Sequence, residues 1–481
     1  MTVAFDLSRP RRLHVVGVTG TGMSAYASVL VQAGHQVTGS DAAADPEVAQ
    51  RLQALGVIVH HGHDATHLPP EVEAVAASTA VAADNPELAE ARRRLVPILR
   101  RADLLAALCR GRRTLAVSGT HGKTTTSALL ALALRAAGRH PSFVMGADVP
   151  ALDHGAHWDD RDDLLVAEAD ESDGTFLELP RSLAVVTSVE ADHLATYGGT
   201  LKGLHDAFAR FATETDGPVV LGVDDPGAAA LLSVRPDAVT FGMGAGAAFR
   251  LADLVPERLR ARFTLHHAGR AIPVVLPAPG LHNAANAAAA VAAAVTVGAD
   301  PERAAAGLAA YRGVHRRFEV RGERDGITFV DDYAHLPGEV RAVLAAARGG
   351  RWDRVVAVFQ PHRFSRTAEV HPQFASAFAD ADVLVITGIY PAGEAPRPGI
   401  SGRLLADASG HPALTYVEER SEVAPVVRAL LRPGDLCLSL GAGDITTLAT
   451  ELLLERSGQP PPHWTEGRGP AREGPRGKAE A

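Results

Sequence analysis

The amino-acid sequence predicts an α/β protein built on mainly parallel sheets, with helices on both faces of each sheet. Two observations lead to this class. Short apolar segments that fit strands alternate with helical segments through most of the chain, which is typical of consecutive βαβ units. The chain also has 481 residues. That is too many for one hydrophobic core, so about three domains of ordinary size are expected.

The first block of the chain fits a strand, a glycine turn, a helix and a second strand. We expect these elements at residues 13–18, 23–32 and 36–39, with the turn spaced as G-x-x-G-x-G. Because glycines let the backbone approach an anion, and a helix N-terminus favours negative charge, the turn is a candidate cradle for a diphosphate. The candidate residues are Gly17, Gly20, Gly22 and Met23 at the turn, with Ser40 and Asp41 at the end of the second strand, where a sugar hydroxyl would be bound.

The rest of the chain repeats this alternation in two further blocks. The second block opens with a strand at 114–118 and a helix at 125–137, and the third opens near residue 315. Joints are expected at 109–113 and 313–316. These joints give domains at 1–110, 111–314 and 315–457. Further strands are expected at 164–167, 183–187, 219–222, 328–330, 355–359, 383–386 and 436–440.

The composition disfavours several classes of protein. The net charge is −9 and no long basic run occurs, so nucleic acid is a poor candidate for the main partner. No apolar run of about 18 residues suggests a membrane helix, and the N-terminal segment lacks the apolar core of a secretory signal. The two cysteines form no C-x-x-C pair, which fits a reducing cytoplasm. Residues 458–481 are rich in Pro, Gly and charge, and we expect them to be disordered.

A glycine-rich loop between strand and helix in the second block predicts a nucleoside triphosphate site, most simply for ATP. The strict pattern G-x-x-x-x-G-K-[ST] is absent, because Val117 stands at its first glycine. The order strand, loop, helix still directs backbone N–H groups at phosphates, which disfavours a mere surface turn. Lys123 can reach the outer phosphates and Thr124 can bind Mg²⁺. The loop consists of Gly119, Thr120, His121, Gly122, Lys123, Thr124 and Thr125.

Carboxylates gather where two later strands end. The first group is Glu168, Asp170, Glu171 and Asp173. Clustered carboxylates repel one another unless a cation is present, and Mg²⁺ prefers oxygen ligands. A solvated acidic loop is the alternative, but the position downstream of a phosphate loop favours a metal. The second group is Glu190, Asp192 and His193. Here His193 is a candidate ligand, although a lone histidine is more often structural.

Two other groups of polar side chains fit nucleotide or substrate contacts. Asn283 and Asn286 open an alanine-rich segment at 284–297 that reads as a buried helix, and they share one helical face. They either contact the edge of a purine or cap the helix. His362, Arg363 and Arg366 follow the strand expected at 355–359, which is more positive charge than a solvated strand end needs.

In their order along the chain, these motifs resemble those of the Mur ligase family, the ATP-dependent amide-forming enzymes of cell-wall precursor synthesis. The loop has the form G-T-x-G-K-T-T, the acidic strand end reads E-A-D-E-S-D, and the alanine-rich helix begins with P-G-x-H-N-x-x-N-A. Then follow R-R-F-E at 316–319, D-D-Y-A-H at 331–335 and H-R-F-S-R at 362–366. The likeness runs from about residue 13 to about residue 454.

The resemblance implies a Rossmann-like N-terminal domain for a UDP-sugar, a central domain like a P-loop ATPase, and a Rossmann-like C-terminal domain for an amino acid. Within the family the alanine-adding members are most similar. The implied substrates are therefore UDP-N-acetylmuramate and L-alanine, joined through an acyl phosphate, with ATP and Mg²⁺ as cofactors. Neither nucleic acid nor membrane insertion is implied. The implied location is the cytoplasm, as a monomer or weak homodimer.

The resemblance also assigns roles to individual residues. It implies catalytic roles for Lys123, Glu171, His193, Arg317 and His335. It implies Mg²⁺ ligands at Thr124, Glu171 and His193. It places Asn283 and Asn286 at the adenine, Arg317 at the γ-phosphate, the first glycine turn at UDP, and Tyr333, His362, Arg363 and Arg366 at the amino acid. Lys202 has no counterpart, and we expect it on the surface.

Some alternatives stay open. Leu336 replaces a polar residue of the family pattern, which questions the role of that position, and Thr19 and Thr21 replace small residues of the first turn. A sibling ligase that adds another amino acid or a peptide would share most of these features. A nicotinamide oxidoreductase is disfavoured by the glycine spacing and by the second phosphate loop. A non-catalytic nucleotide sensor has Leu336 as its only support.

Overall fold

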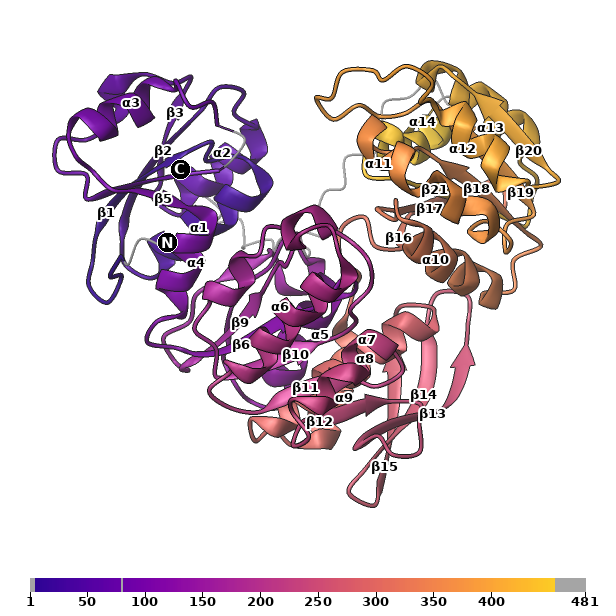
Figure 1. The fold of residues 1–481 in the computed structure, drawn as a ribbon, viewed down its shortest axis with the longest axis horizontal. Coiled ribbons are helices and arrows are strands. Elements are labelled where there is room, and N and C mark those ends of the chain that lie inside the picture. The colour runs from indigo at the N-terminus through magenta and orange to yellow at the C-terminus, as the bar shows by residue number, and fades with distance from the viewer. Residues whose placement is uncertain (1–4, 79–80, 455–481) are drawn as a thin grey trace, which may run out of the picture.

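The structure is a computed structural model that describes residues 5–78 and 81–454. The tail expected to be disordered, 458–481, therefore lies outside the described residues. The chain forms three sheets, each from one continuous part of the sequence and each in its own lobe (Figure 1). The predicted class, an α/β chain with three parallel-rich sheets, is confirmed. The boundaries expected near 110 and 314 fall between consecutive sheets, and the boundaries themselves stay predictions.

The first lobe is a five-stranded, wholly parallel sheet in the order β3-β2-β1-β4-β5. Strand β1 is buried along all but its first residue, as expected of a parallel strand covered by helices on both faces. Strand β2 runs on to Asp41, so Ser40 and Asp41 are its last two residues. The strands are β1 (Arg12–Val16), β2 (Gln36–Asp41), β3 (Ile58–His61), β4 (Ala74–Ala77) and β5 (Ile98–Arg100); the helices are α1 (Thr21–Gln32), α2 (Pro46–Ala54), α3 (Pro86–Arg93) and α4 (Arg101–Cys109).

The central lobe contains a ten-stranded sheet in the order β15-β14-β13-β12-β11-β10-β6-β9-β7-β8. Helix α8 is the predicted alanine-rich helix, and its small side chains pack with those of α5 in the core of this lobe. The strands are β6 (Arg113–Ser118), β7 (Ser142–Val144), β8 (Ala156–His157), β9 (Leu164–Glu168), β10 (Leu183–Val186), β11 (Val219–Gly222), β12 (Val239–Gly242), β13 (Phe249–Pro256), β14 (Ala261–His267) and β15 (Arg270–Leu276). The helices are α5 (Lys123–Ala136), α6 (Leu201–Thr213), α7 (Pro226–Ala230), α8 (Leu281–Thr296) and α9 (Pro301–Gly307).

The antiparallel extension β13-β14-β15 was not among the expected strands. Its strands alternate buried and exposed residues, because one face covers the core and the other faces solvent. Strands β14 and β15 are joined through Ala268 and Gly269, both at positive φ (47° and 76°), which is typical of a tight hairpin turn.

The third lobe is a six-stranded sheet in the order β16-β17-β21-β18-β19-β20, parallel except for the β16-β17 hairpin. Helix α10 lies on the side of this lobe that faces the central lobe (Figure 1). The strands are β16 (Glu319–Arg324), β17 (Ile327–Asp332), β18 (Arg354–Phe359), β19 (Val383–Thr387), β20 (Leu414–Val417) and β21 (Asp435–Leu440); the helices are α10 (Pro337–Gly349), α11 (Phe364–Val370), α12 (Gly402–Ser409), α13 (Val423–Leu430) and α14 (Leu448–Leu454).

Local sequence explains where several helices begin. Four of them start with an Asp or Asn whose side chain accepts a backbone N–H of the first turn, followed by proline at the first helical position. These caps are Asp45, Asn85, Asp225 and Asp300.

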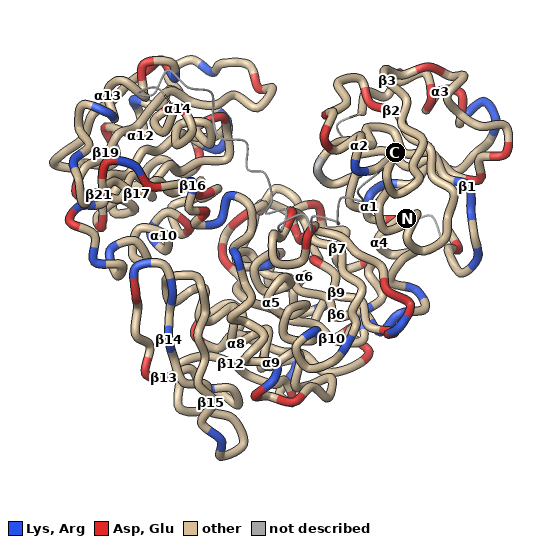
Figure 2. Tube along the Cα trace, turned by 180° about the vertical axis from the view of Figure 1, so that it is seen from behind, with Lys and Arg blue, Asp and Glu red and all other residues tan. Residues whose placement is uncertain are grey.

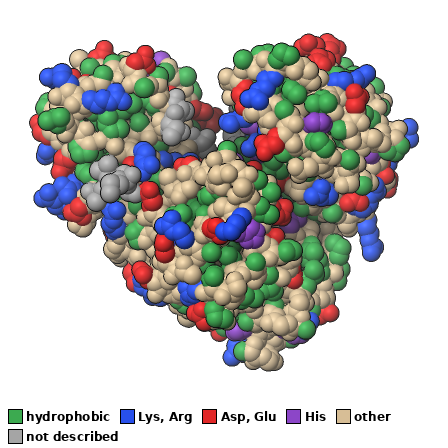
Figure 3. All heavy atoms as spheres, in the orientation of Figure 1, with side chains coloured by type: hydrophobic (Ala, Val, Ile, Leu, Met, Phe, Trp, Pro, Cys, Tyr) green, Lys and Arg blue, Asp and Glu red, His purple; other side chains and the backbone are tan. Residues whose placement is uncertain are grey.

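Charges of both signs are interspersed over all three lobes (Figure 2), and a hollow separates the first and third lobes above the central one (Figure 3). Within the described ranges no helix is long and apolar enough to cross a membrane.

Candidate active site

The phosphate loop is held between the segment that follows β10 and the start of α8, and its two glycines are required by that packing. Gly119 has a φ of +133°, and a Cβ there would lie 2.1 Å from Oγ1 of Thr187. Gly122 has a φ of +79°, and a Cβ there would lie 2.4 Å from Oδ1 of Asn286. Val117 is buried inside β6, so the position of the first glycine in the strict motif falls within the strand. This explains why the loop is short.

Hydrogen bonds fasten the loop to residues 187–190. The N–H of Thr120 donates to the carbonyl of Ser188 (2.9 Å), and the N–H of His121 donates to the hydroxyl of Ser188 (3.1 Å). The N–H of Glu190 in turn donates to the hydroxyl of Thr120 (2.9 Å). These bonds fix the loop backbone without a ligand, which is what preorganised anion binding needs.

Lys123 is the first residue of α5 and lies almost buried beneath the loop. Its Nζ is 2.8 Å from Oε2 of Glu171 and donates to the carbonyl of Gly119 (2.9 Å). Burial alone would lower the pKa of this amine, but the Glu171 and Asp170 carboxylates outweigh burial and raise the pKa above its ordinary value. Lys123 is thus positively charged at neutral pH, where it can neutralise phosphate oxygens.

Two carboxylates at the acidic strand end, Glu168 and Glu171, have different partners. Oε1 of Glu168 accepts the hydroxyl of Thr124 (3.0 Å), while its Oε2 accepts the N–H of Gly146 (2.8 Å). Glu171 instead pairs with Lys123. A hydroxyl and a carboxylate side by side, with a second carboxylate near, are oxygen donors that fit Mg²⁺. Glu168 was not among the predicted ligands, and its position next to Thr124 makes it a candidate.

His193 stands away from this pair. It has a φ of +51° at the start of a short 3₁₀ turn (Leu194–Tyr197), and its Nε2 lies 3.3 Å from the carboxylate of Asp192. In the described part of the chain, no group of three or more His, Cys, Asp or Glu side chains is arranged to hold a metal ion. The role of His193 as a ligand therefore stays a prediction.

The two asparagines at the start of α8 lie in different surroundings. Nδ2 of Asn283 donates to the carbonyl of Pro279 (2.7 Å), which is a local bond at the helix start. Asn286 instead packs directly on Gly122 of the phosphate loop. Both are buried. The N-cap of α8 is Gly280, without a side-chain cap bond, and Asn283 donates to a carbonyl rather than accepting an N–H of the helix. The contact of the two asparagines with adenine stays a prediction.

The first glycine turn is braced by the residues predicted to meet the sugar. Asp41 accepts both the N–H (3.0 Å) and the hydroxyl (2.6 Å) of Thr19, so the threonine that departs from the family pattern has a structural partner. Ser40 is fully buried and donates to Glu87 (2.5 Å). A Cβ on Gly22 would lie 3.3 Å from Arg101, whose guanidinium is also 3.7 Å from Asp170. Arg101 is therefore a cation between the turn and the acidic strand end.

In the third lobe, residues predicted for the γ-phosphate, for catalysis and for the amino acid form one contiguous aromatic and basic group. The guanidinium of Arg317 lies over the ring of Tyr333 (5.4 Å), and the ring of His335 contacts those of Tyr333 (5.3 Å) and His362 (5.7 Å). Nη1 of Arg366 is 3.3 Å from Nδ1 of His362. The structure therefore brings these side chains together, as their motifs suggested.

A cleft of about 390 Å³ lies between the central and third lobes and is lined by residues of both. The central lobe contributes His121 and His193, and the third lobe contributes Arg363 and Arg366. Leu336 also lines the cleft, so the departure from the family pattern adds an apolar side chain to its wall. Tyr333, His335 and His362 do not line the cleft itself, and the ring of His335 contacts the rings of the other two.

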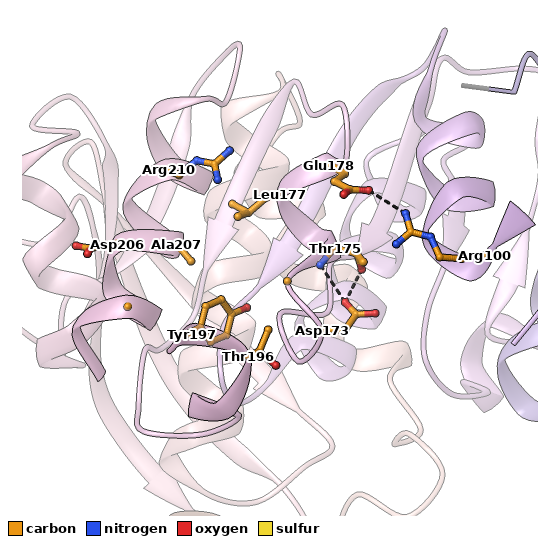
Figure 4. Close-up of a pocket in the computed structure, with 12 residues that line it drawn as sticks. Arg100, Asp173, Thr175, Leu177, Glu178, Thr196, Tyr197, Asp206, Ala207 and Arg210 are labelled. Atoms are coloured by element: carbon orange, nitrogen blue, oxygen red, sulfur yellow. Dashed lines mark hydrogen bonds and ion pairs between the residues drawn. The ribbon is translucent and has the colours of Figure 1, made fainter. Parts of the chain in front are cut away.

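A second cavity of about 450 Å³ lies between η3 (Thr175–Glu178), η4 (Leu194–Tyr197) and α6 (Figure 4). Arg100 reaches it from the first lobe and pairs with Glu178 (3.3 Å). Asp173 of the acidic strand end lines this cavity, but the phosphate loop, His193 and the arginines of the third lobe do not. We therefore take the cleft that holds His121 and Arg366 as the reaction site.

Comparison with known proteins identifies the class of protein. Models described as "Mur ligase family, catalytic domain", "Mur ligase middle domain" and "Mur ligase, glutamate ligase domain" match residues 12–113, 117–294 and 316–443. The chain belongs to the Mur ligase family.

The chain is similar over most of its length to particular ligases of this family. The chain is 42% identical over 466 residues to the UDP-N-acetylmuramate–L-alanine ligase of Thermobifida fusca, covering 94% of this chain and 98% of the relative. It is 45% identical over 460 residues to the ligase of the same name from Kineococcus radiotolerans, covering 93% and 96%. The crystal structure of the UDP-N-acetylmuramate-alanine ligase of Thermotoga maritima matches with a TM-score of 0.76 at 30% identity, covering 92% and 98%.

Two charged residues near the site, Glu339 and Arg101, escaped the sequence interpretation, while Glu168 and Glu190 were named in the carboxylate groups without a role of their own. Glu339 had one available signal, since a glutamate two residues after a helix-starting proline is a typical cap. No local pattern shows which residues meet across two lobes.

Proposed function

We propose that this protein is an ATP-dependent ligase that joins L-alanine to the carboxylate of UDP-N-acetylmuramate through an acyl phosphate. The observation that carries the proposal is the cleft in which the phosphate loop of the central lobe faces Arg363 and Arg366 of the third lobe. Identity above 40% over nearly the whole chain to ligases that carry this activity in their names supports the choice of substrates.

The first step forms the acyl phosphate. A carboxylate oxygen of UDP-N-acetylmuramate attacks the γ-phosphorus of ATP, the bond to the bridging oxygen breaks, and ADP leaves. Lys123 from the loop and Arg317 from the third lobe neutralise the charge on the transferred group, which is the main need of phosphoryl transfer. Mg²⁺ held by Thr124 with Glu168 or Glu171 would supply further charge neutralisation at the phosphates. Arg101 lies beside the first glycine turn, where its positive charge suits an anionic group of UDP-N-acetylmuramate.

The second step forms the amide. The amine of L-alanine attacks the acyl carbon, inorganic phosphate leaves with one oxygen of the former carboxylate, and the proton of the amine passes to that phosphate. Arg363 and Arg366 suit the alanine carboxylate, because an arginine fork binds two oxygens at once. The apolar wall that includes Leu336 suits a small aliphatic side chain. We place the enzyme in the cytoplasm, as a monomer or weak homodimer.

The test is release of inorganic phosphate from ATP and Mg²⁺ with UDP-N-acetylmuramate and each proteinogenic amino acid in turn. We expect L-alanine to give the highest kcat/KM and omission of the amino acid to stop turnover. A preference for a peptide or another amino acid would identify a sibling ligase instead. Failure of every amino acid to trigger turnover would identify a nucleotide sensor. The matched variants are Lys123→Ala, expected to be inactive, and Lys202→Ala, expected to be unchanged because Lys202 is exposed and pairs with Asp206 on the surface (2.6 Å).

A further inference from the structure

Glu339 is the third residue of α10, and its two carboxylate oxygens have different partners. Oε2 accepts the backbone N–H groups of His335 (3.0 Å) and Leu336 (3.2 Å), which caps the helix. Oε1 instead faces two cationic groups outside the helix. It lies 3.6 Å from Nδ1 of His121 and 3.8 Å from Nη1 of Arg317. One side chain of the third lobe therefore contacts the phosphate loop of the central lobe.

His121 is fixed at its backbone and extends its side chain across the gap between the lobes. Its carbonyl accepts the hydroxyl of Thr187, and its Nε2 lies 3.5 Å from Oε2 of Glu190. Its Nδ1 is buried without a hydrogen-bond partner within the described residues, so a small approach of Glu339 would complete a bond. Burial alone would lower the pKa of His121, but Glu190 and Glu339 outweigh it and raise the pKa to about 9. The ring is thus an imidazolium at neutral pH.

The close approach of α10 to the loop has a sequence basis. Gly338 stands directly before Glu339, and a Cβ there would already lie 3.3 Å from Oε2 of Glu190. A Cβ at this position would require the Glu190 carboxylate, which faces His121, to shift by a few tenths of an ångström. The helix cap alone explains neither the glycine nor the two cations, because a neutral glutamine at this position caps a helix through one oxygen equally well.

We propose that Glu339 is a positioning residue that docks the amino-acid lobe onto the phosphate loop and holds His121 and Arg317 at its outer-phosphate end. The transferred phosphoryl group then meets both cations only when the third lobe is seated. Because Lys123 and the other loop residues belong to the central lobe alone, they bind the nucleotide whether or not α10 is docked. The inference rests on the proposed function, since it concerns the first step of that reaction.

The test compares Glu339→Gln with Glu323→Gln, an exposed glutamate on β16 of the same lobe. Glutamine keeps the cap and removes the charge. We expect kcat to fall about ten- to a hundredfold, the cost of a misplaced catalytic group, with the KM for ATP little changed and the thermal midpoint lowered no more than in His121→Gln. Glu323→Gln should match the wild type. His121→Gln leaves the helix untouched and should lower kcat by a similar factor, and the double variant should lose no more than either single variant.

A kcat of Glu339→Gln equal to the wild-type value would overturn the inference, and so would losses that multiply in the double variant. A thermal midpoint of Glu339→Gln far below that of His121→Gln would assign Glu339 to the cap alone. A second readout needs no turnover. A non-hydrolysable ATP analogue should slow amide hydrogen exchange at the start of α10 in the wild type and in Glu323→Gln, but not in Glu339→Gln. Equal protection in all three proteins would overturn the inference, whereas failure of the proposed function would show as a wild type without alanine-dependent phosphate release.

Discussion

Replacing Lys123 with methionine separates its contribution to stability from its contribution to chemistry. The side chains of Lys123 and Glu171 are 15% and 2% exposed, and their charged atoms are 2.8 Å apart. Removing one partner of such a pair costs about 3–5 kcal/mol, because the other charge stays buried, whereas replacing both partners is often neutral. Burial raises the pKa of Glu171, so protonation of its carboxyl relieves part of this cost. We expect Lys123→Met to lower the free energy of unfolding by about 2–3 kcal/mol.

The assay is urea unfolding of Lys123→Met, Glu171→Gln and the double variant, with alanine-dependent phosphate release measured on each. The double variant should recover to within about 1 kcal/mol of the wild type, since no buried charge remains uncompensated. It should nevertheless be inactive, as should Lys123→Met. A double variant as unstable as the sum of the single variants would refute the reasoning about the pair. Substantial turnover by Lys123→Met would refute the assigned role in phosphoryl transfer.

Three further predictions concern the same region. Gly119→Ala should cost at least about 2 kcal/mol more than Gly138→Ala, because both residues have positive φ but only Gly119 has a side chain in the way; urea unfolding measures this, and equal costs would contradict the packing argument. The pKa of His121 is raised to about 9, so its stabilising contribution is complete below its ordinary pKa of about 6.5 and is lost as pH rises through 9. The stability advantage of the wild type over His121→Gln should therefore shrink between pH 7 and pH 10, and a pH-independent difference would contradict the ion-pair account. Thr124→Val should raise the Mg²⁺ concentration for half-maximal activity about tenfold or more, with Thr124→Ser close to the wild type; an unchanged Mg²⁺ dependence would remove Thr124 from the metal site.

The sequence was most informative where the chemistry is local. The strands at 114–118, 164–167 and 219–222 are short apolar runs next to turns, and they form β6, β9 and β11 with bounds shifted by no more than a residue. The phosphate loop could be predicted because strand, glycines and helix are consecutive in the chain. Helix α5 begins at Lys123 rather than at 125, because the left-handed conformation of Gly122 already serves as its N-cap.

Contacts between distant segments could not be predicted from the sequence. Nothing near Glu168 indicates that it would accept the hydroxyl of Thr124 while Glu171 pairs with Lys123, since either carboxylate can reach the loop from a strand end. The double role of Glu339 depends on how two lobes meet. The β14–β15 hairpin is different, because the alternation of apolar and polar residues at 261–266 in β14 was a usable signal of a strand with one face exposed to solvent.

Isotope transfer tests the proposed chemistry most directly. UDP-N-acetylmuramate labelled with ¹⁸O in its carboxylate is turned over with ATP and L-alanine, and the released phosphate is analysed by mass spectrometry. Attack of the carboxylate on the γ-phosphorus predicts that each phosphate released carries one oxygen from the carboxylate. Unlabelled phosphate, or label found in AMP, would contradict an acyl phosphate formed at the loop that contains Lys123.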